Sequence, residues 1–166
     1  MQFGIYSNEV KMVKNKLEGL FSKSLKAASG IWGMKLHNNM LAHQTTPADY
    51  IITLERNFKP IIMLVECKQV TCEEGGQGRF AFRRLKQLHD LESFETVFGF
   101  HESYLCLGYH ERGWNNGSIY IVPIEVFAKL MKTHRAKSLN RKDAELHLKD
   151  YKVKMNNGVM DLWQLK

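Results

Sequence analysis

The chain has 166 residues, of which 44% are hydrophobic, and 24 Lys and Arg stand against 17 Asp and Glu, giving a formal net charge of +7. This length suits one domain with a sizeable core, and no linker rich in Pro, Gly or Ser divides it, so we expect a single domain over residues 1–166. No apolar stretch approaches membrane-spanning length and the N-terminus lacks a secretory apolar segment, which predicts a cytoplasmic protein without a membrane partner.

The excess of positive charge suits a protein that holds a polyanion such as DNA by neutralising phosphates, although charge alone identifies no partner. The three cysteines, Cys67, Cys72 and Cys106, form no CxxC motif, which predicts reduced, buried thiols rather than a disulfide scaffold. The histidines are scattered without finger-like spacing, so we do not expect a zinc site.

A first amphipathic helix is predicted between Asn8, which can cap it, and Gly30, which offers a stop. Its apolar positions recur at helical spacing at Val10, Val13, Leu17, Leu20, Phe21 and Leu25. Glu18 lies at the edge of this stripe, on the side of Phe21 and Leu25. It either faces a functional site or is a solvated residue at the rim of the helix.

A β-hairpin is predicted next, because two β-rich runs, residues 50–54 and 61–68, flank a polar turn that ends in Pro60. A register symmetric about Asn57 and Phe58 pairs Leu54 with Ile61. The same register places Asp49 opposite Glu66, with their Cβ atoms roughly 5 Å apart. The alternative is that Asp49 only caps a turn.

The second strand of this hairpin contains five consecutive apolar residues, 61–65, which indicates burial on both faces. Glu66 and Lys68 follow directly and share one face, whereas Cys67 turns into the core. They either form a surface pair on an edge strand or mark a functional site, and the cost of placing charges against a core favours the site.

These residue types suit a divalent cation. Mg²⁺ prefers oxygen ligands and is usually held by one or two carboxylates together with water and substrate phosphate, with Mn²⁺ as its substitute. We predict Asp49, Glu66 and the backbone carbonyl of Cys67 as ligands. Lys68 would orient or deprotonate the attacking water beside the metal.

A basic helix is predicted from about Phe80 to Phe94, after a glycine-rich loop at residues 75–78. It contains Gln87, and its candidate DNA contacts, together with Lys35, are Arg79, Arg83, Arg84 and Lys86. The alternative is a solvated basic helix with an inert amide. Further on we expect strands at 104–109 and 118–122, helices at 124–132 and 142–149, and a tight hairpin at residues 156–158.

The motifs Pro47-Ala48-Asp49 and Glu66-Cys67-Lys68 resemble the two signature pieces of the PD-(D/E)XK nuclease superfamily. Residues 79–91 and 119–127 are similar to the glutamine-bearing helix and the late strand of RecU-type Holliday junction resolvases. Only residues 33–47 are available for the RecU stalk, a length closer to the compact Hjc resolvases.

This resemblance implies an α/β, restriction-endonuclease-like fold, with a mixed central β-sheet flanked by α-helices. It also implies that Glu18 joins the metal site and that Gln87 positions water or the scissile phosphate. We therefore expect a Mg²⁺-dependent, structure-selective DNA endonuclease, in particular a homodimeric Holliday junction resolvase, because paired nicks need two symmetric sites. The alternatives are a nuclease for linear, flap or single-stranded DNA, and a non-catalytic DNA-binding module.

Overall fold

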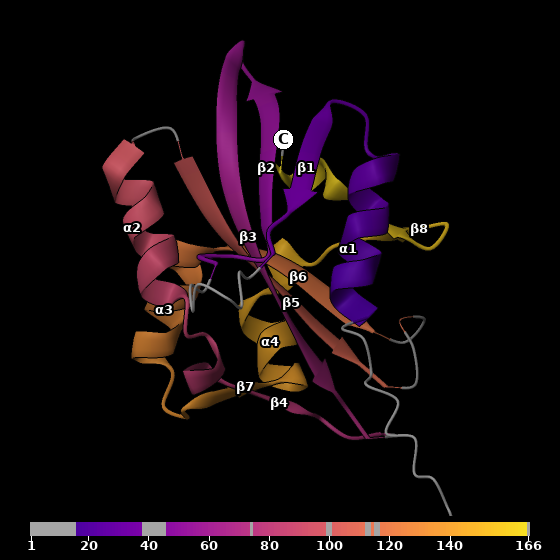
Figure 1. Cartoon of the computed structure of the whole chain (residues 1–166). Helices are drawn as coiled ribbons and strands as arrows, with labels where there is room; N and C mark the ends of the chain where they lie inside the picture. Colours follow the sequence, from indigo (N-terminus) through magenta and orange to yellow (C-terminus); the bar gives the residue numbers. More distant parts are fainter. Residues whose placement is uncertain are drawn as a thin grey trace, which may run out of the picture.

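The computed structural model describes residues 16–37, 46–73, 75–98, 101–111, 114 and 117–165. Its centre is a five-stranded sheet in the order β1-β2-β3-β5-β6 (Figure 1). The strands are β1 (Ile31–Lys35), β2 (Tyr50–Arg56), β3 (Lys59–Thr71), β5 (His101–His110) and β6 (Ser118–Pro123). β3 and β5 run parallel and the other neighbours run antiparallel, so the sheet is mixed.

Helices cover both faces of the sheet. α1 (Lys16–Ala27) packs on one face, where its Leu17 and Phe21 join one apolar cluster. The second cluster, on the opposite face, holds side chains of α2 (Leu88–Phe98), α3 (Ile124–Thr133) and α4 (Arg141–His147). In Figure 1, α1 and α2 accordingly lie on opposite sides of the strands. The chain is therefore an α/β protein with a mixed sheet between helical layers.

β3 is the central strand and is buried on both faces, as predicted. Met63, Val65 and Cys67 face the α1 side, and Leu64 and Val70 face the other side. The hairpin register is also confirmed, because Leu54 pairs with Ile61. The turn between the strands has a positive φ at both Asn57 (φ 52°) and Phe58 (φ 61°), as a two-residue type I′ hairpin turn requires.

The first predicted helix is confirmed from Lys16 to Ala27, and Gly30 follows it with a positive φ of 72°. The proposed cap Asn8 and the apolar positions Val10 and Val13 lie outside the described residues.

The helix predicted from Phe80 to Phe94 is wrong in its first half. Residues Arg79–Ala81 form a strand, β4, that pairs with β7 (Ser138–Asn140). A single 3₁₀ turn, η2 (Phe82–Arg84), follows this strand. The helix α2 begins only at Leu88. The physical reason is burial: the rings of Phe80 and Phe82 both lie 6.0 Å from that of Phe127 on α3. Burying both phenylalanines required extended backbone and a 3₁₀ turn rather than a continuous helix.

The later elements are close to their predicted positions. β5, β6 and α3 lie where strands and a helix were expected, and the fourth helix, α4, is shorter and ends before a 3₁₀ turn, η3 (Lys149–Tyr151). β8 (Met155–Asn156) and β9 (Val159–Met160) form the predicted tight hairpin, with positive φ at Asn157 and Gly158. All three cysteines are free and buried, as predicted.

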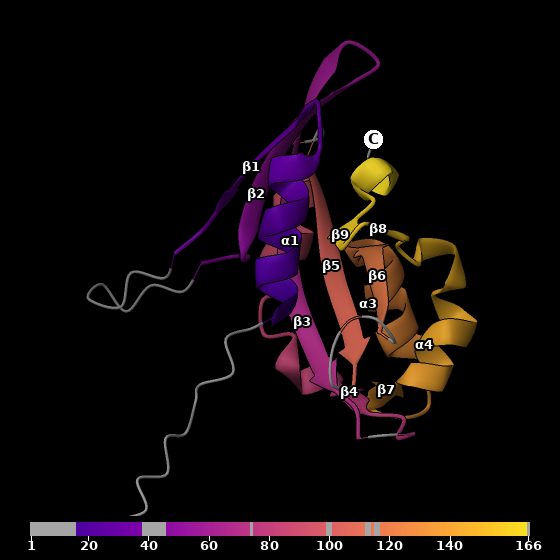
Figure 2. The ribbon, with the colours of Figure 1, turned by 90° about the vertical axis from the view of Figure 1, so that its right-hand side faces the viewer.

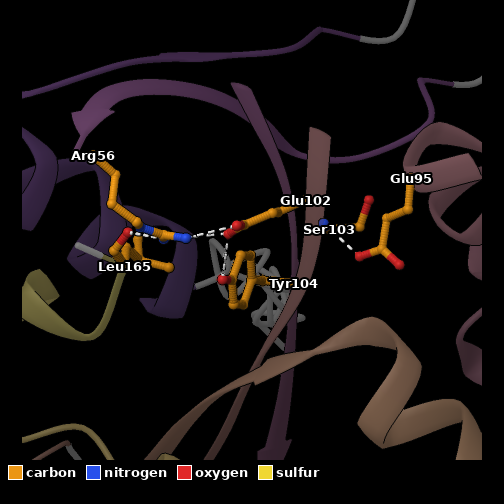
Figure 3. A network of polar contacts seen from close by, with 6 residues as sticks. All are labelled: Arg56, Glu95, Glu102, Ser103, Tyr104 and Leu165. Carbon is orange, nitrogen blue, oxygen red and sulfur yellow. Dashed lines mark hydrogen bonds and ion pairs between the residues drawn. The ribbon is translucent and has the colours of Figure 1, made fainter. Parts of the chain in front are cut away.

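The C-terminal 3₁₀ turn, η4 (Leu162–Leu165), is tied to the sheet by a polar network (Figure 3). The guanidinium of Arg56 donates two hydrogen bonds to the Glu102 carboxylate, at 2.6 and 3.3 Å, and one to the Leu165 carbonyl at 2.7 Å. Tyr104 donates to the same carboxylate at 2.7 Å. Within the described part of the chain, no helix has the length and apolar character needed to cross a membrane.

Candidate active site

The two predicted carboxylates meet where β2 and β3 separate. The paired ladder ends with Tyr50 opposite Val65, and Asp49 and Glu66 are the next residues on the two strands. The Asp49 side chain takes over from the ladder, since its Oδ2 accepts a hydrogen bond of 2.7 Å from the backbone N–H of Cys67. The predicted apposition of Asp49 with the start of the Glu66-Cys67-Lys68 motif is therefore present.

Glu66 is the buried carboxylate of the pair, with only 1% of its surface exposed. The Lys68 ammonium donates a hydrogen bond to Glu66 Oε1, so these two charges share one face of β3 as predicted. Glu66 Oε2 is also buried, and no described atom forms a hydrogen bond with it. A buried carboxylate oxygen without a donor is costly, and a cation beside it would remove that cost.

The electrostatics of the site favour a positive charge between the carboxylates. Burial raises the pKa of Glu66 to about 7, the nearby Asp49 carboxylate adds to this rise, and Lys68 opposes it. Burial likewise raises the pKa of Asp49, although the hydrogen bond from the Cys67 N–H offsets part of the effect. Two neighbouring carboxylates thus repel each other's negative charge at neutral pH, which a bound cation would relieve.

Cys67 contributes its backbone to the site and its thiol to the core. Cys67 pairs in register with Cys106 on β5. Burial is the main cause of the raised pKa of the Cys67 thiol, and the interaction with Cys106 adds to it. Because the N–H and C=O of one strand residue point to the same edge, the Cys67 carbonyl lies on the edge that its N–H shares with Asp49. That is the location predicted for a carbonyl ligand.

Glu18 approaches the site from α1. Its backbone carbonyl accepts a hydrogen bond of 2.8 Å from the Tyr50 hydroxyl, and its negative charge contributes to the raised pKa of Asp49. The Glu18 carboxylate forms an ion pair with Lys35 on β1, and this hydrogen bond is the main cause of the raised pKa of Lys35. Lys35, predicted as a DNA contact, therefore lies beside the carboxylates and is paired with Glu18.

These residues fit a hard divalent cation with several open coordination positions. Asp49 and Glu66 supply carboxylate oxygens and Cys67 supplies a carbonyl, which are the ligand types that Mg²⁺ prefers. Among the described residues, no three His, Cys, Asp or Glu side chains are grouped so as to hold a metal by themselves. A cation here would thus complete its shell with water or with substrate oxygens, as Mg²⁺ commonly does.

Gln87 lies just before α2 rather than inside a helix, and its carbonyl accepts the first helical hydrogen bond, from Leu91 N at 3.0 Å. Its side-chain Oε1 is buried and has no hydrogen-bond partner among the described residues. None of the interactions of the described chain joins Gln87 to Asp49 or Glu66, so its predicted role stays a prediction.

The four basic residues of segment 79–86, namely Arg79, Arg83, Arg84 and Lys86, are all exposed. Arg84 reaches the site most directly, because it donates a hydrogen bond of 3.2 Å to the backbone carbonyl of Gln69, the residue after Lys68. The Gln69 side chain accepts a hydrogen bond of 3.2 Å from Leu17 N in the first turn of α1. Gln69 and Tyr50 thus connect the site to α1, and sequence reasoning missed both, although each directly follows a predicted site residue.

No protein-family model matches the chain, and no curated protein matches it.

Proposed function

We propose that this protein is a Mg²⁺-dependent, structure-selective DNA endonuclease with a restriction-endonuclease-like fold, in particular a homodimeric Holliday junction resolvase, with Mn²⁺ as a substitute metal. One observation carries the proposal. Two carboxylates, Asp49 and Glu66, converge at the divergence of β2 and β3, with an ammonium group, Lys68, bound to one of them. Hydrolysis of a phosphodiester needs a cation, a positioned water and charge stabilisation, and these groups suit all three tasks.

Each residue has a task that follows from its contacts. The Cys67 N–H fixes the orientation of Asp49, and burial fixes that of Glu66. Lys68, which donates a hydrogen bond to Glu66 Oε1, would orient the attacking water, and as the neutral amine it would accept the water's proton. When bound, Mg²⁺ would supply Lewis-acid stabilisation of the charge that develops on the phosphate oxygens. Glu18 can support the same oxygen-rich environment, provided that its carboxylate exchanges Lys35 for the metal.

The surroundings of the site also suit DNA. The exposed basic side chains of segment 79–86 belong to the same part of the molecule as the site, because Arg84 bonds to the residue after Lys68. The formal net charge of +7 adds a general attraction for phosphates. Along the chain, the main elements are a helix, a three-stranded meander, a second helix and a strand parallel to β3. This order is compatible with a fold of the restriction-endonuclease type.

The test is a cleavage assay in Mg²⁺ that compares a four-way junction having a mobile core with linear duplex of equal length. We expect paired nicks in the junction, little cutting of the duplex, and no cutting by Asp49→Asn. Equal cutting of both DNAs would replace the resolvase by a nuclease of broader substrate range. Failure to cut any DNA, together with no Mg²⁺ or Mn²⁺ binding that depends on Asp49 and Glu66 in calorimetry, would refute the nuclease.

A further inference from the structure

Among the described strands, β1 lies at the edge of the sheet and presents large apolar side chains to solvent. It pairs with β2 and is the first strand in the sheet order. Trp32 is 58% exposed and Met34 is 50% exposed, both on the face opposite to Ile31, which packs in the α1 cluster. Edge strands with exposed apolar side chains are templates for pairing with another chain. Figure 2 shows β1 and β2 at the margin of the molecule, away from α3 and α4.

We infer that β1 is the contact surface for a second copy of this chain, with the two β1 strands antiparallel about a two-fold axis at Gly33. The sequence of β1 is Ile31-Trp32-Gly33-Met34-Lys35. An antiparallel pair centred on Gly33 places Trp32 opposite Met34 of the second copy, and Met34 opposite the second Trp32. Four exposed apolar side chains would then bury one another on one face, including two contacts between sulfur and an aromatic ring.

Gly33 suits the centre of such a pair. A Cβ at this position would lie 2.9 Å from Leu25 Cδ1, so the residue is kept small by the packing of α1 on the other face. β1 therefore presents its backbone and its two exposed side chains at the edge of the described sheet, while its other face packs against the core.

The charges on this face argue for a protein partner and against nucleic acid. Beside Trp32 and Met34, the same face of β2 carries Ile51, Thr53 and Glu55, as their cross-strand pairing shows. The one charged residue of these five is acidic, and it would repel phosphates. A self-complementary strip that is mainly apolar and has no basic residue among these five suits an isologous contact between two copies.

The size of the strip predicts a weak dimer. The exposed parts of Trp32 and Met34 amount to roughly 200 Å² per copy, judged from the 150–250 Å² that an aromatic side chain buries. This is about a quarter of the ~800 Å² per partner in a standard interface, so after the cost of association we expect a Kd no tighter than about 100 µM for the protein alone. Bound DNA that spans both copies would strengthen the contact.

The inference rests on the proposed function, because an enzyme that makes paired nicks needs two active sites held at a fixed distance from each other. A two-fold axis perpendicular to the sheet keeps both candidate sites on the same face. With a strand rise of about 3.4 Å and a strand spacing of about 4.8 Å, the two Asp49 residues would lie roughly 25 Å apart. That separation corresponds to about seven base pairs at a rise of 3.4 Å, which two opposed strands of a junction can span.

The test is light scattering over roughly 10–1,000 µM, a range that brackets the expected Kd, with a charge-swap design. We expect the wild type to dimerise and Trp32→Lys/Met34→Lys to be monomeric, because the paired register brings lysines of the two copies together. Trp32→Glu/Met34→Lys should dimerise again, because each glutamate then faces a lysine of the other copy. Leu146→Lys, which changes an exposed apolar residue on α4 that is 68% exposed, is the matched control and should stay dimeric.

A second variant keeps the test independent of these substitutions. In Trp32→Cys/Met34→Cys, mild oxidation should yield a covalent dimer, since the three native cysteines are buried. A monomeric wild type with and without junction DNA, or a Lys/Lys variant as dimeric as the wild type, would overturn the interface. So would a Lys/Lys variant altered only in DNA affinity, which would make the strip a nucleic-acid contact. A monomer that still cuts DNA at Asp49-dependent sites would refute the interface and leave the nuclease standing.

Discussion

The burial of Glu66 gives a sharp prediction about pH and stability. Burial raises the folded-state pKa of Glu66 from 4.5 to about 7, and one pKa unit corresponds to about 1.4 kcal/mol. The folded protein therefore binds this proton more tightly than the unfolded chain does. The stabilising contribution is fully present below the unfolded pKa and is lost as the pH rises through the folded pKa. Ionised Glu66 should thus cost the folded state about 3 kcal/mol.

We expect the free energy of unfolding of the metal-free protein to fall by about 3 kcal/mol between about pH 5 and about pH 8. Urea denaturation at a series of pH values measures this directly. Glu66→Gln should remove most of the decline, because the amide does not ionise. The raised pKa of Asp49 acts with the same sign, so Asp49→Asn/Glu66→Gln should remove more of it than Glu66→Gln alone.

Two additions separate this mechanism from a general effect of pH. Glu145 has a lowered pKa, because Lys152 and then the Tyr120 hydroxyl form hydrogen bonds with it. Glu145→Gln, the control, should therefore leave the loss of stability above pH 5 intact. Mg²⁺ at about one hundred times its Kd should restore about 2.7 kcal/mol to the wild type and nothing to Glu66→Gln. Equal pH dependence in wild type and Glu66→Gln would refute the reasoning.

Three further predictions concern other parts of the molecule. Arg56→Met removes the hydrogen bonds to Glu102 and to the C-terminal turn, and should cost about 1–3 kcal/mol in urea denaturation; a Glu102→Gln variant as stable as the wild type would contradict the pairing. Phe58→Gly should stabilise the protein by about 0.5–1 kcal/mol in thermal unfolding, because a 96% exposed phenylalanine holds a left-handed φ of 61°. Arg83→Ala should lower the slope of log binding constant against log salt for DNA by about 1, and an unchanged slope would remove Arg83 from the interface.

The features that could be predicted from the sequence are those fixed by local pattern. The polar turn at Asn57 and Phe58 sets the register of the hairpin, so the pairing of Leu54 with Ile61 followed from symmetry alone. The run of apolar residues in β3 likewise identified a strand buried on both faces, and Lys68 followed Glu66 on one face by the two-residue period of a strand.

The features that could not be predicted depend on partners distant in the chain. Phe80, Phe82 and Leu85 fit either a helix or an extended segment, and the choice was made by β7 and by Phe127, both more than forty residues away. The hydrogen bond between Gln69 and Leu17 N spans a sequence separation of 52 residues. No local pattern distinguishes a glutamine that holds a distant helix from one that faces solvent.

The geometry of the candidate site follows from the unequal lengths of two paired strands. β2 has 7 residues and begins at Tyr50, whereas β3 has 13 and continues to Thr71. Beyond Val65 the edge of β3 has therefore lost its β2 partner, and its polar groups need others. The Asp49 carboxylate takes the N–H of Cys67, and Arg84 takes the carbonyl of Gln69. The backbone groups of β3 that lack a β2 partner thus bring a carboxylate and a basic side chain to one strand edge. Glu66 and Lys68 lie in the same stretch because β3 continues through it.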